Sequence, residues 1–325
     1  MKERIVSGIQ PTGEMHIGNY LGALKDFVEL QDKYDCYFFI ADLHSLTEDY
    51  EPKKKHQQIL DLAETFLAVG LDPLKCTLFI QSEIPAHSEL AWIFNSITPM
   101  GELERMTQYK DKASRQKANI NVGLFDYPVL QAADILLYKP QYVPVGHDQV
   151  QHLEMTNTIA KKFNNKFSET FQEIKPYIKK PLRIMSLIDP TRKMSKSEPN
   201  STINIFEDPA IIKKKLSKAV TATDAPKGEM PKGVSNLFEL LRHFGSAELV
   251  DRFNKEYNDN TIKYSELKNT LADVIAKYFE EMRNKKQQLN KDQEQVKRIF
   301  TAGSKKAAVV ADQTLREVKE KVGLL

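Results

Sequence analysis

Residues 189–197 form a polar stretch whose cations could stabilise a phosphate. Arg192, Lys193 and Lys196 lie within five residues of one another, and a proline near each end opposes helix formation. Such a loop can neutralise the negative charge that develops on a phosphoryl group as it reacts. Taken by itself, the stretch is better explained as a solvated basic loop.

A second candidate phosphate site lies near the N-terminus, in residues 7–19. Its three glycines permit tight turns and close approach of the backbone to a ligand. A helix expected from about Gly18 would direct free N–H groups and its positive dipole end at an anion, and His16 and Asn19 add side-chain donors. The glycine spacing is neither that of a dinucleotide fold nor that of a Walker loop. A glycine-rich connection with a surface histidine explains the segment about equally well.

Three polar residues share one face of a helix predicted over 127–138. Tyr127, Gln131 and Asp134 are spaced i, i+4 and i+7, and the residues between them are apolar on nearly every side, which indicates burial. A buried carboxylate and a buried amide need hydrogen-bond partners. Either an amino-acid ligand in a pocket or an internal hydrogen-bond network would supply them.

These candidates must be positioned by alternating strands and helices. The apolar patterns predict strands at 5–8, 36–41, 76–80 and 142–145, and helices at 19–31, 53–69, 90–97, 127–138 and 149–163. Repeated βα units predict an α/β fold with a doubly wound parallel sheet, a Rossmann-like nucleotide-binding domain. From Pro209 onward only helix patterns occur, the best at Tyr264–Lys286. We therefore expect a domain over 1–205, ending with the lysine loop, and an all-helical domain over 206–325.

Composition limits the class of protein. The chain has 325 residues, which suits two domains, and no apolar run approaches the about 20 residues of a membrane helix. We expect a cytoplasmic protein without membrane contact. Cys36 and Cys76 lie in apolar runs, so neither a disulfide nor a cysteine metal site is expected. Residues 206–325 carry 23 Lys and Arg against 18 Asp and Glu, which fits either a phosphate-contacting domain or a solvated helical surface.

The two candidate phosphate sites together resemble a known pair of signatures. His-Ile-Gly-Asn at 16–19 resembles the His-Ile-Gly-His signature of class I aminoacyl-tRNA synthetases, and Lys-Met-Ser-Lys-Ser at 193–197 matches the second signature of that class. Residues 7–13, 101–108, 132–138 and 143–149 are similar to the tryptophan enzymes of the class. The resemblance implies an enzyme that attaches L-tryptophan to tRNA(Trp) through a tryptophanyl-adenylate.

The resemblance also implies roles for individual residues. The catalytic residues would be Lys193, Lys196 and Lys112, acting with Mg²⁺ bound through the ATP phosphates and with no metal held by the protein. ATP, a substrate, would be bound by Gln10, Pro11, Thr12, His16, Gly18, Asn19, Gly146, His147, Asp148, Ile184, Met194, Ser195 and Ser197 together with the two loop lysines. Tryptophan would be bound by Asp134 at the indole N–H, with Tyr127, Gln131, Gln149 and Val6 around it. The helical domain would bind the tRNA anticodon, and the protein would be a homodimer.

Two residues depart from the tryptophan family. Gln131 stands where most bacterial members have methionine, and His147 where glutamate is usual. The nearest alternative is a tyrosyl-tRNA synthetase, in which a tyrosine occupies the position of Val6 and meets the phenol of the substrate. More distant alternatives are a nucleotidylyltransferase and a synthetase-like binding protein that has lost catalysis. His44 is a weaker pocket candidate, and His87 is interpreted as a packing or surface residue.

Overall fold

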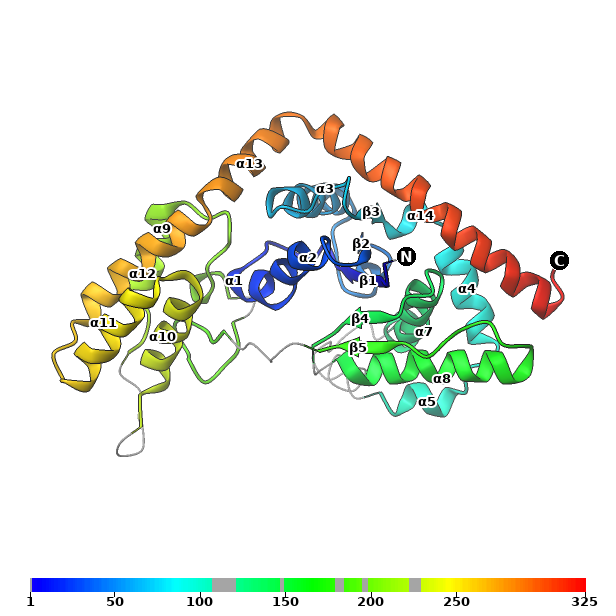
Figure 1. The fold of residues 1–325 in the computed structure, drawn as a ribbon, viewed down its shortest axis with the longest axis horizontal. Coiled ribbons are helices and arrows are strands. Elements are labelled where there is room, and N and C mark those ends of the chain that lie inside the picture. The colour runs from blue at the N-terminus through cyan, green and yellow to red at the C-terminus, as the bar shows by residue number, and fades with distance from the viewer. Residues whose placement is uncertain (1, 107–120, 147–148, 179–183, 195–197, 222–228) are drawn as a thin grey trace. The chain divides into compact units, whose positions relative to one another are not determined.

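The structure is a computed structural model that describes residues 2–106, 121–146, 149–178, 184–194, 198–221 and 229–325. Contacts divide the chain into two compact units, which are described separately (Figure 1). The first contains Met1–Thr12, Asp26–Pro181 and Lys291–Leu325, and the second contains Gly13–Lys25 and Leu182–Asn290.

A five-stranded parallel sheet forms the centre of the first unit. Its strands are β1 (Arg4–Ile9), β2 (Asp35–Ile40), β3 (Thr77–Ile80), β4 (Tyr142–Pro144) and β5 (Lys175–Tyr177). The strand order is β3-β2-β1-β4-β5, and every neighbouring pair is parallel. The predicted doubly wound parallel sheet is therefore confirmed. The chain reverses its direction of winding between β1 and β4, and ligands of such sheets bind at this switch point, at the carboxyl ends of the strands.

Helices cover both faces of the sheet because its buried strands present apolar side chains alternately to the two sides. The helices of this unit are α2 (Lys25–Leu30), α3 (Pro52–Ala68), α4 (Ala86–Asn95), α5 (Met100–Glu104), α7 (Val122–Leu136), α8 (Val150–Lys166) and α14 (Gln293–Val322). Phe38 of β2 stacks on Phe27 of α2 at 4.2 Å between ring centroids. Tyr37 and Phe39 point to the opposite face, into a core shared with α4, α7 and α8.

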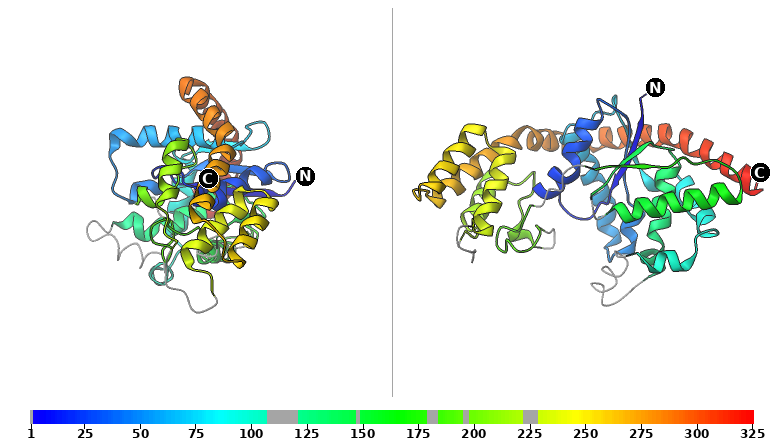
Figure 2. Two further views of the ribbon diagram at one scale, coloured as in Figure 1. Left: turned by 90° about the vertical axis from the view of Figure 1, so that its left-hand side faces the viewer. Right: turned by 60° about the horizontal axis from the view of Figure 1, so that its bottom comes forward.

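The last helix of the chain, α14, docks against β3 (red in Figure 2). A Cβ atom at Gly303 would overlap the carbonyl oxygen of Leu78 and lie 2.8 Å from its carbonyl carbon, so only glycine permits this approach. The Ile80 N–H donates to Ser304 Oγ at 3.3 Å. This packing differs from the expected helical domain over 206–325, because residues 293–322 associate with the sheet.

The second unit is mainly helical. It contains α1 (Ile17–Asn19), the π-helical turn η1 (Tyr20–Leu24), the 3₁₀ turn η5 (Pro199–Ser201), α9 (Pro209–Ser217), α10 (Lys232–Phe244), α11 (Ala247–Asn258), α12 (Tyr264–Tyr278) and most of α13 (Glu280–Lys291). The single helix predicted over 264–286 is two helices that meet at Phe279. The ring of Tyr20 packs edge-on against Phe279 at 5.1 Å, and its hydroxyl lies 2.9 Å from that of Tyr278. Residues 13–25 consequently belong with the helices, another difference from the predicted boundary at 205/206.

Two further features concern the described part of the chain. None of the helices described there combines the length and the apolar composition that crossing a membrane requires. Cys36 and Cys76 are buried free thiols, and burial raises the pKa of each to about 12. Both cysteines are therefore unreactive packing residues, as their sequence context predicts.

Candidate active site

A cavity of about 370 Å³ lies in the first unit at the switch point between β1 and β4. Its walls come from the carboxyl ends of β1, β2 and β4 and from one side of α7. The lining residues are Val6, Ser7, Gly8, Gln10, Phe39, Ala41, His44, Tyr127, Gln131, Asp134, Ile135, Val143, Pro144, Val145 and Gln149. One part of the wall is aliphatic and aromatic, and the rest carries hydroxyl, amide, imidazole and carboxylate groups. All five residues predicted to bind tryptophan are among them.

Helix α7 contributes three polar side chains to the cavity, on the face that the sequence predicts. The helix begins where the Asn121 side chain accepts a hydrogen bond from the Leu124 N–H at 2.9 Å. Burial raises the pKa of Tyr127 to about 12, so its phenol stays neutral, and the hydroxyl lies 2.6 Å from His152 Nε2. Gln131 is half-buried in the wall.

Asp134, the third of these residues, is 1% exposed and is hydrogen-bonded by three side chains. Its Oδ2 lies 2.7 Å from His44 Nε2, while Oδ1 accepts from Gln81 Nε2 at 2.7 Å and lies 2.6 Å from His87 Nδ1. Burial alone raises the pKa of this carboxyl, but the interactions with His44 and His87 outweigh burial and lower it to about 2. Asp134 is therefore ionised near neutral pH and can only accept hydrogen bonds.

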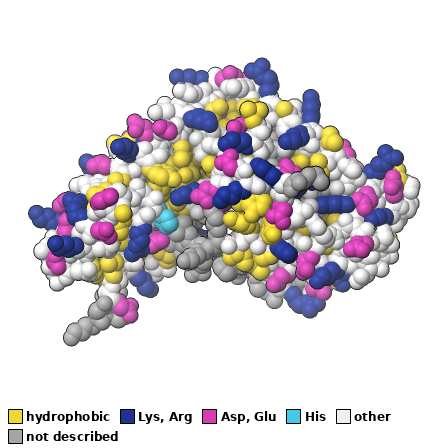
Figure 3. All heavy atoms as spheres, viewed as in Figure 1, with side chains coloured by type: hydrophobic (Ala, Val, Ile, Leu, Met, Phe, Trp, Pro, Cys, Tyr) yellow, Lys and Arg dark blue, Asp and Glu magenta, His cyan; other side chains and the backbone are white. Residues whose placement is uncertain are grey.

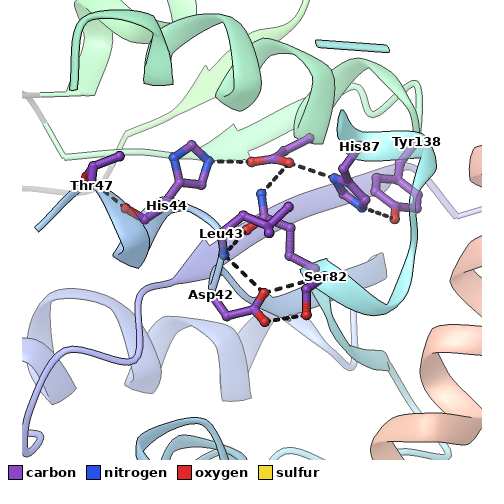
Figure 4. Close-up of polar contacts among 9 residues, drawn as sticks. Asp42, Leu43, His44, Thr47, Ser82, His87 and Tyr138 are labelled. Atoms are coloured by element: carbon purple, nitrogen blue, oxygen red, sulfur yellow. Dashed lines mark hydrogen bonds and ion pairs between the residues drawn. The ribbon is translucent and has the colours of Figure 1, made fainter. Parts of the chain in front are cut away.

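The partners of Asp134 come from the ends of neighbouring strands and from α4 (Figure 4). His44 begins the 3₁₀ turn η2 (His44–Thr47) after β2, and Gln81 begins η3 (Gln81–Glu83) directly after β3. His87 lies in the first turn of α4 and is fully buried, and its Nε2 is 2.8 Å from the Tyr138 hydroxyl. His87 is a buried packing residue, one of the two roles that the sequence allows, and both of its ring nitrogens also have polar partners.

A second carboxylate ties the same strand ends together. Asp42 accepts hydrogen bonds from the backbone N–H of Leu43 at 3.2 Å and of Ser82 at 3.0 Å, and its other oxygen accepts from the Ser82 hydroxyl (Figure 4). These bonds hold the turns after β2 and β3 next to each other. Because His44 and Gln81 lie in those turns, Asp42 fixes the backbone that carries two partners of Asp134.

The glycine-rich N-terminal segment divides between the two units. Gln10, Pro11 and Thr12 belong to the first unit, where the Thr12 N–H donates to the Gln10 carbonyl at 2.9 Å. Gly13, at φ 68°, takes a left-handed conformation that favours glycine. From this glycine onward the segment belongs to the second unit.

His16 caps the short helix α1 in the second unit. Its Nδ1 accepts the Gly18 N–H at 3.0 Å, and Asn19 Oδ1 accepts the His16 N–H at 3.3 Å. The segment pairs with residues 203–205, since the Ile17 N–H donates to the Ile203 carbonyl at 2.9 Å. The side chains of His16 and Asn19 therefore act as acceptors in these bonds, and the Gly18 N–H, one of the donors expected to face an anion, is used inside the segment.

The lysine loop lies in the same unit as His16. The Met194 N–H donates to the Ile184 carbonyl at 3.0 Å, Met194 is buried, and Lys193 is exposed. The structure therefore brings the first signature segment and the described part of the second, Lys193 and Met194, into one compact unit, whereas the cavity belongs to the other. Six predicted site residues lie outside the described residues: Lys112, His147, Asp148, Ser195, Lys196 and Ser197. Gly146 and Gln149 flank the gap at 147–148, and the Gln149 N–H donates to the Gly146 carbonyl at 2.9 Å.

A family model and two full-length relatives assign the chain to the same family. The model described as tRNA synthetases class I (W and Y) matches residues 2–301. A tryptophan–tRNA ligase of Caldanaerobacter subterraneus subsp. tengcongensis is 46% identical over 329 residues, which cover 99% of each chain. One from Clostridium tetani is 44% identical over 330 residues, covering all of this chain and 96% of the relative.

The fold gives the same result. The crystal structure of tryptophanyl-tRNA synthetase from Campylobacter jejuni complexed with ADP and tryptophan superposes with a TM-score of 0.88 at 35% identity, over 98% of this chain and 99% of the other. The family model, two full-length relatives and the superposed fold all agree with the two signature segments. The chain therefore belongs to the tryptophan and tyrosine group of class I tRNA synthetases and, within that group, to the bacterial tryptophan–tRNA ligases.

Proposed function

We propose that this protein activates L-tryptophan with ATP and transfers it to tRNA(Trp). The observation that carries the proposal is the cavity at the switch point, which combines apolar walls with one buried, ionised acceptor, Asp134. An indole ring needs both features, because its two fused rings are apolar while its buried N–H must find an acceptor. The full-length relatives at 44% and 46% identity are tryptophan–tRNA ligases, which supports the same substrate.

The side chain at position 6 favours tryptophan over tyrosine. Val6 is fully buried in the cavity wall and offers no hydrogen bond. A phenol placed against Asp134 could donate its proton, but Val6 would leave the phenolic oxygen without a donor on that side. An indole N–H has no lone pair that needs a donor, so the apolar side chain of Val6 does not weaken its binding. The tyrosine alternative is accordingly the weaker one for this cavity.

Other residues of the wall would bind the amino-acid part of the substrate. Tyr127 and Gln149 line the cavity and can accept hydrogen bonds from an ammonium group, and Gln131 lies on the same face of α7. ATP would contact Gln10, Pro11 and Thr12 and the segment His16–Asn19. Gly146, His147, Asp148 and Ile184 would surround its nucleoside.

The first reaction step forms the adenylate. A carboxylate oxygen of tryptophan attacks the α-phosphorus of ATP, the bond to the β-phosphate oxygen breaks, and pyrophosphate leaves with the electron pair. The nucleophile is already ionised at neutral pH, so no general base is required. Lys193, Lys196 and Lys112 would stabilise the charge that grows on pyrophosphate, together with Mg²⁺ bound through the phosphates.

The second step transfers the amino acid to tRNA. A ribose hydroxyl of the terminal adenosine attacks the carbonyl carbon of the adenylate, AMP leaves, and the hydroxyl proton is released. We assign the helices of the second unit, between residues 206 and 290, to anticodon binding, and we propose that the protein acts as a homodimer in the cytoplasm, where tRNA is used. Figure 3 shows Lys and Arg side chains interspersed with Asp and Glu over the face in view.

Amino-acid-dependent exchange of pyrophosphate into ATP tests the proposed substrate. Tryptophan should support exchange, and tyrosine should support at most about one-hundredth of it in kcat/KM, because one unpaired buried polar group separates the two substrates. Equal or faster exchange with tyrosine would assign the protein to the tyrosine alternative.

The lysine loop provides the matching test of mechanism. Lys196→Ala should lower the exchange rate about 100-fold or more while tryptophan binding changes little, since the charge acts mainly in the transition state. Lys213→Ala, which removes an exposed lysine of α9 in the same unit, is the control and should leave exchange unchanged. Near-normal exchange in Lys196→Ala would reject the assigned role.

A further inference from the structure

A line of buried hydrogen bonds runs from Tyr138 through His87 to Asp134, behind the wall of the cavity. Tyr138 and His87 are fully buried, and neither lines the cavity. The Tyr138 hydroxyl is 2.8 Å from His87 Nε2, and His87 Nδ1 is 2.6 Å from Asp134 Oδ1 (Figure 4). His87 therefore connects the acceptor in the cavity to a phenol that no substrate can reach.

The positions of the protons in this line follow from its chemistry. Burial and the neighbouring Asp134 charge raise the pKa of Tyr138, so its phenol keeps its proton. In the described part of the chain, His87 is the partner to which that hydroxyl can donate. A proton on His87 Nε2 instead of Nδ1 would set a ring lone pair against the Asp134 carboxylate, and the two would repel. Tyr138 thus selects the form of His87 whose Nδ1–H donates to Asp134.

Gln81 is oriented by a backbone group in the same way. Its Oε1 accepts the Leu43 N–H at 3.1 Å, so its Nε2 must be the atom that faces Asp134 Oδ1. Oδ1 therefore has two donors, Gln81 and His87. Among the residues that the structure describes, Oδ2 has one donor, His44, and it keeps the capacity to accept a second hydrogen bond.

We propose that His87 is a positioning residue for substrate selection: with its proton placed by Tyr138, it holds Asp134 oriented and ionised so that Oδ2 accepts the ring N–H of the substrate. This inference rests on the proposed function, in which that substrate is tryptophan. His87 and Tyr138 would then influence specificity without touching the substrate.

A purely structural role of His87 and Tyr138 would not require polar side chains at these two positions. The pair lies among the rings of Phe39, Phe79 and Tyr37, at centroid distances of 5.1 to 6.1 Å. Apolar side chains of similar size would fill this space at no loss of packing, and buried polar networks commonly stabilise a fold no better than such replacements. What apolar side chains cannot supply is the N–H donor at Asp134. The polar groups of His87 and Tyr138 are therefore better explained by the hydrogen bond that His87 makes with the Asp134 carboxylate.

The test compares tryptophan with β-(3-benzothienyl)alanine, in which sulfur replaces the indole N–H at nearly the same shape. The quantity measured is the ratio of kcat/KM for the two amino acids in pyrophosphate exchange. His87→Leu should lower that ratio by about tenfold, the size of effect expected when one hydrogen bond to a charged group is lost, and leave the KM for ATP unchanged. His87→Asn, whose amide can replace the Nδ1–H donor, should keep the ratio within about threefold of the parent protein.

Tyr138→Phe keeps the packed ring and removes only the hydroxyl, so it also carries the test if His87→Leu does not fold. It should lower the same ratio by about threefold, because the His87 tautomer is no longer selected. A merely structural role would lower kcat/KM for both amino acids equally, and an unchanged ratio in His87→Leu and Tyr138→Phe would overturn the inference. If the parent protein itself preferred tyrosine to tryptophan, the proposed function would fail instead, so the two failures are distinguishable.

Discussion

Replacing Asp134 by asparagine changes the chemistry of the cavity wall while keeping the size of the side chain. The amide would keep its carbonyl oxygen toward Gln81 and His87, which both donate to Oδ1. Its NH₂ group would then take the place of Oδ2, facing His44 Nε2 and, in the proposed complex, the ring N–H of the substrate. His44 can adapt by moving its proton to Nδ1, but the second amide N–H would point at the indole N–H of tryptophan.

The loss can be estimated from these contacts. A hydrogen bond to a charged acceptor contributes about 1.5–3 kcal/mol, and leaving a buried donor unpaired costs about 1–3 kcal/mol more. The sum, about 2.5–6 kcal/mol, corresponds to a fall in kcat/KM for tryptophan of roughly 10²- to 10⁴-fold. The KM for ATP should stay the same, since Asp134 lies in the wall of the amino-acid cavity.

Pyrophosphate exchange at saturating ATP and varied tryptophan measures this change. Asp126→Asn is the matched control, because Asp126 is a half-buried carboxylate of the same helix that accepts from Asn95 and does not line the cavity. That variant should stay within about threefold of the parent protein. A loss below tenfold in Asp134→Asn, or an equal loss in Asp126→Asn, would refute the assignment of Asp134 as the acceptor.

Three other predictions follow from the same structure. The pKa of Asp134 is lowered from 3.8 to about 2, so its ionised form stabilises the fold fully above pH 3.8 and loses this effect as the pH falls toward 2. The measurement is the difference in unfolding free energy between the parent protein and Asp134→Asn as a function of pH. A difference that already became smaller between pH 7 and pH 5 would contradict this prediction. Gln131→Met should keep kcat/KM for tryptophan within about threefold, because the volumes are similar and the carboxylate remains; a loss as large as that of Asp134→Asn would make the amide the primary reader of the substrate. Gly303→Ala should lower the free energy of unfolding in urea by about 3 kcal/mol through overlap with β3, whereas Gly101→Ala, where a Cβ meets no atom within 4 Å, should be nearly neutral.

The sequence predicts the sheet well because its strands are buried on both faces. Each end of the strands predicted at 5–8, 36–41, 76–80 and 142–145 lies within one residue of the observed end. β5, Lys175–Tyr177, was missed because its three residues include a lysine and a proline and give no apolar run. The docking of α14 could not be predicted either, since it depends on the contact of Gly303 with a strand more than 200 residues earlier.

The site was predictable to the extent that its residues lie close together in the sequence. Helical spacing alone places Tyr127, Gln131 and Asp134 on one face, and that face does line the cavity. The donors to Asp134 come from turns and a helix 47 to 90 residues away, so only the folded sheet brings them together. A usable signal existed nonetheless: His44 and Gln81 follow buried strands directly, at the edge of the sheet where ligands bind.

The two explanations that the sequence allows for the polar face of α7, an internal network and a ligand site, are compatible at Asp134. A carboxylate has about four acceptor positions, and the structure occupies three of them with His44, Gln81 and His87. The Asp134 charge is consequently paired by side chains of the protein itself, and a ligand without an N–H leaves only one acceptor position of this carboxylate unused. Rejection of such a ligand must then come mainly from the hydrogen bond it fails to form, about 1.5–3 kcal/mol or roughly 10- to 150-fold. Some sites have polar groups that find a hydrogen-bond partner only in the correct substrate, and such sites reject an analogue by about 10⁴-fold. Asp134 already has partners in the protein, so we do not expect discrimination of that size between tryptophan and an analogue whose ring lacks the N–H.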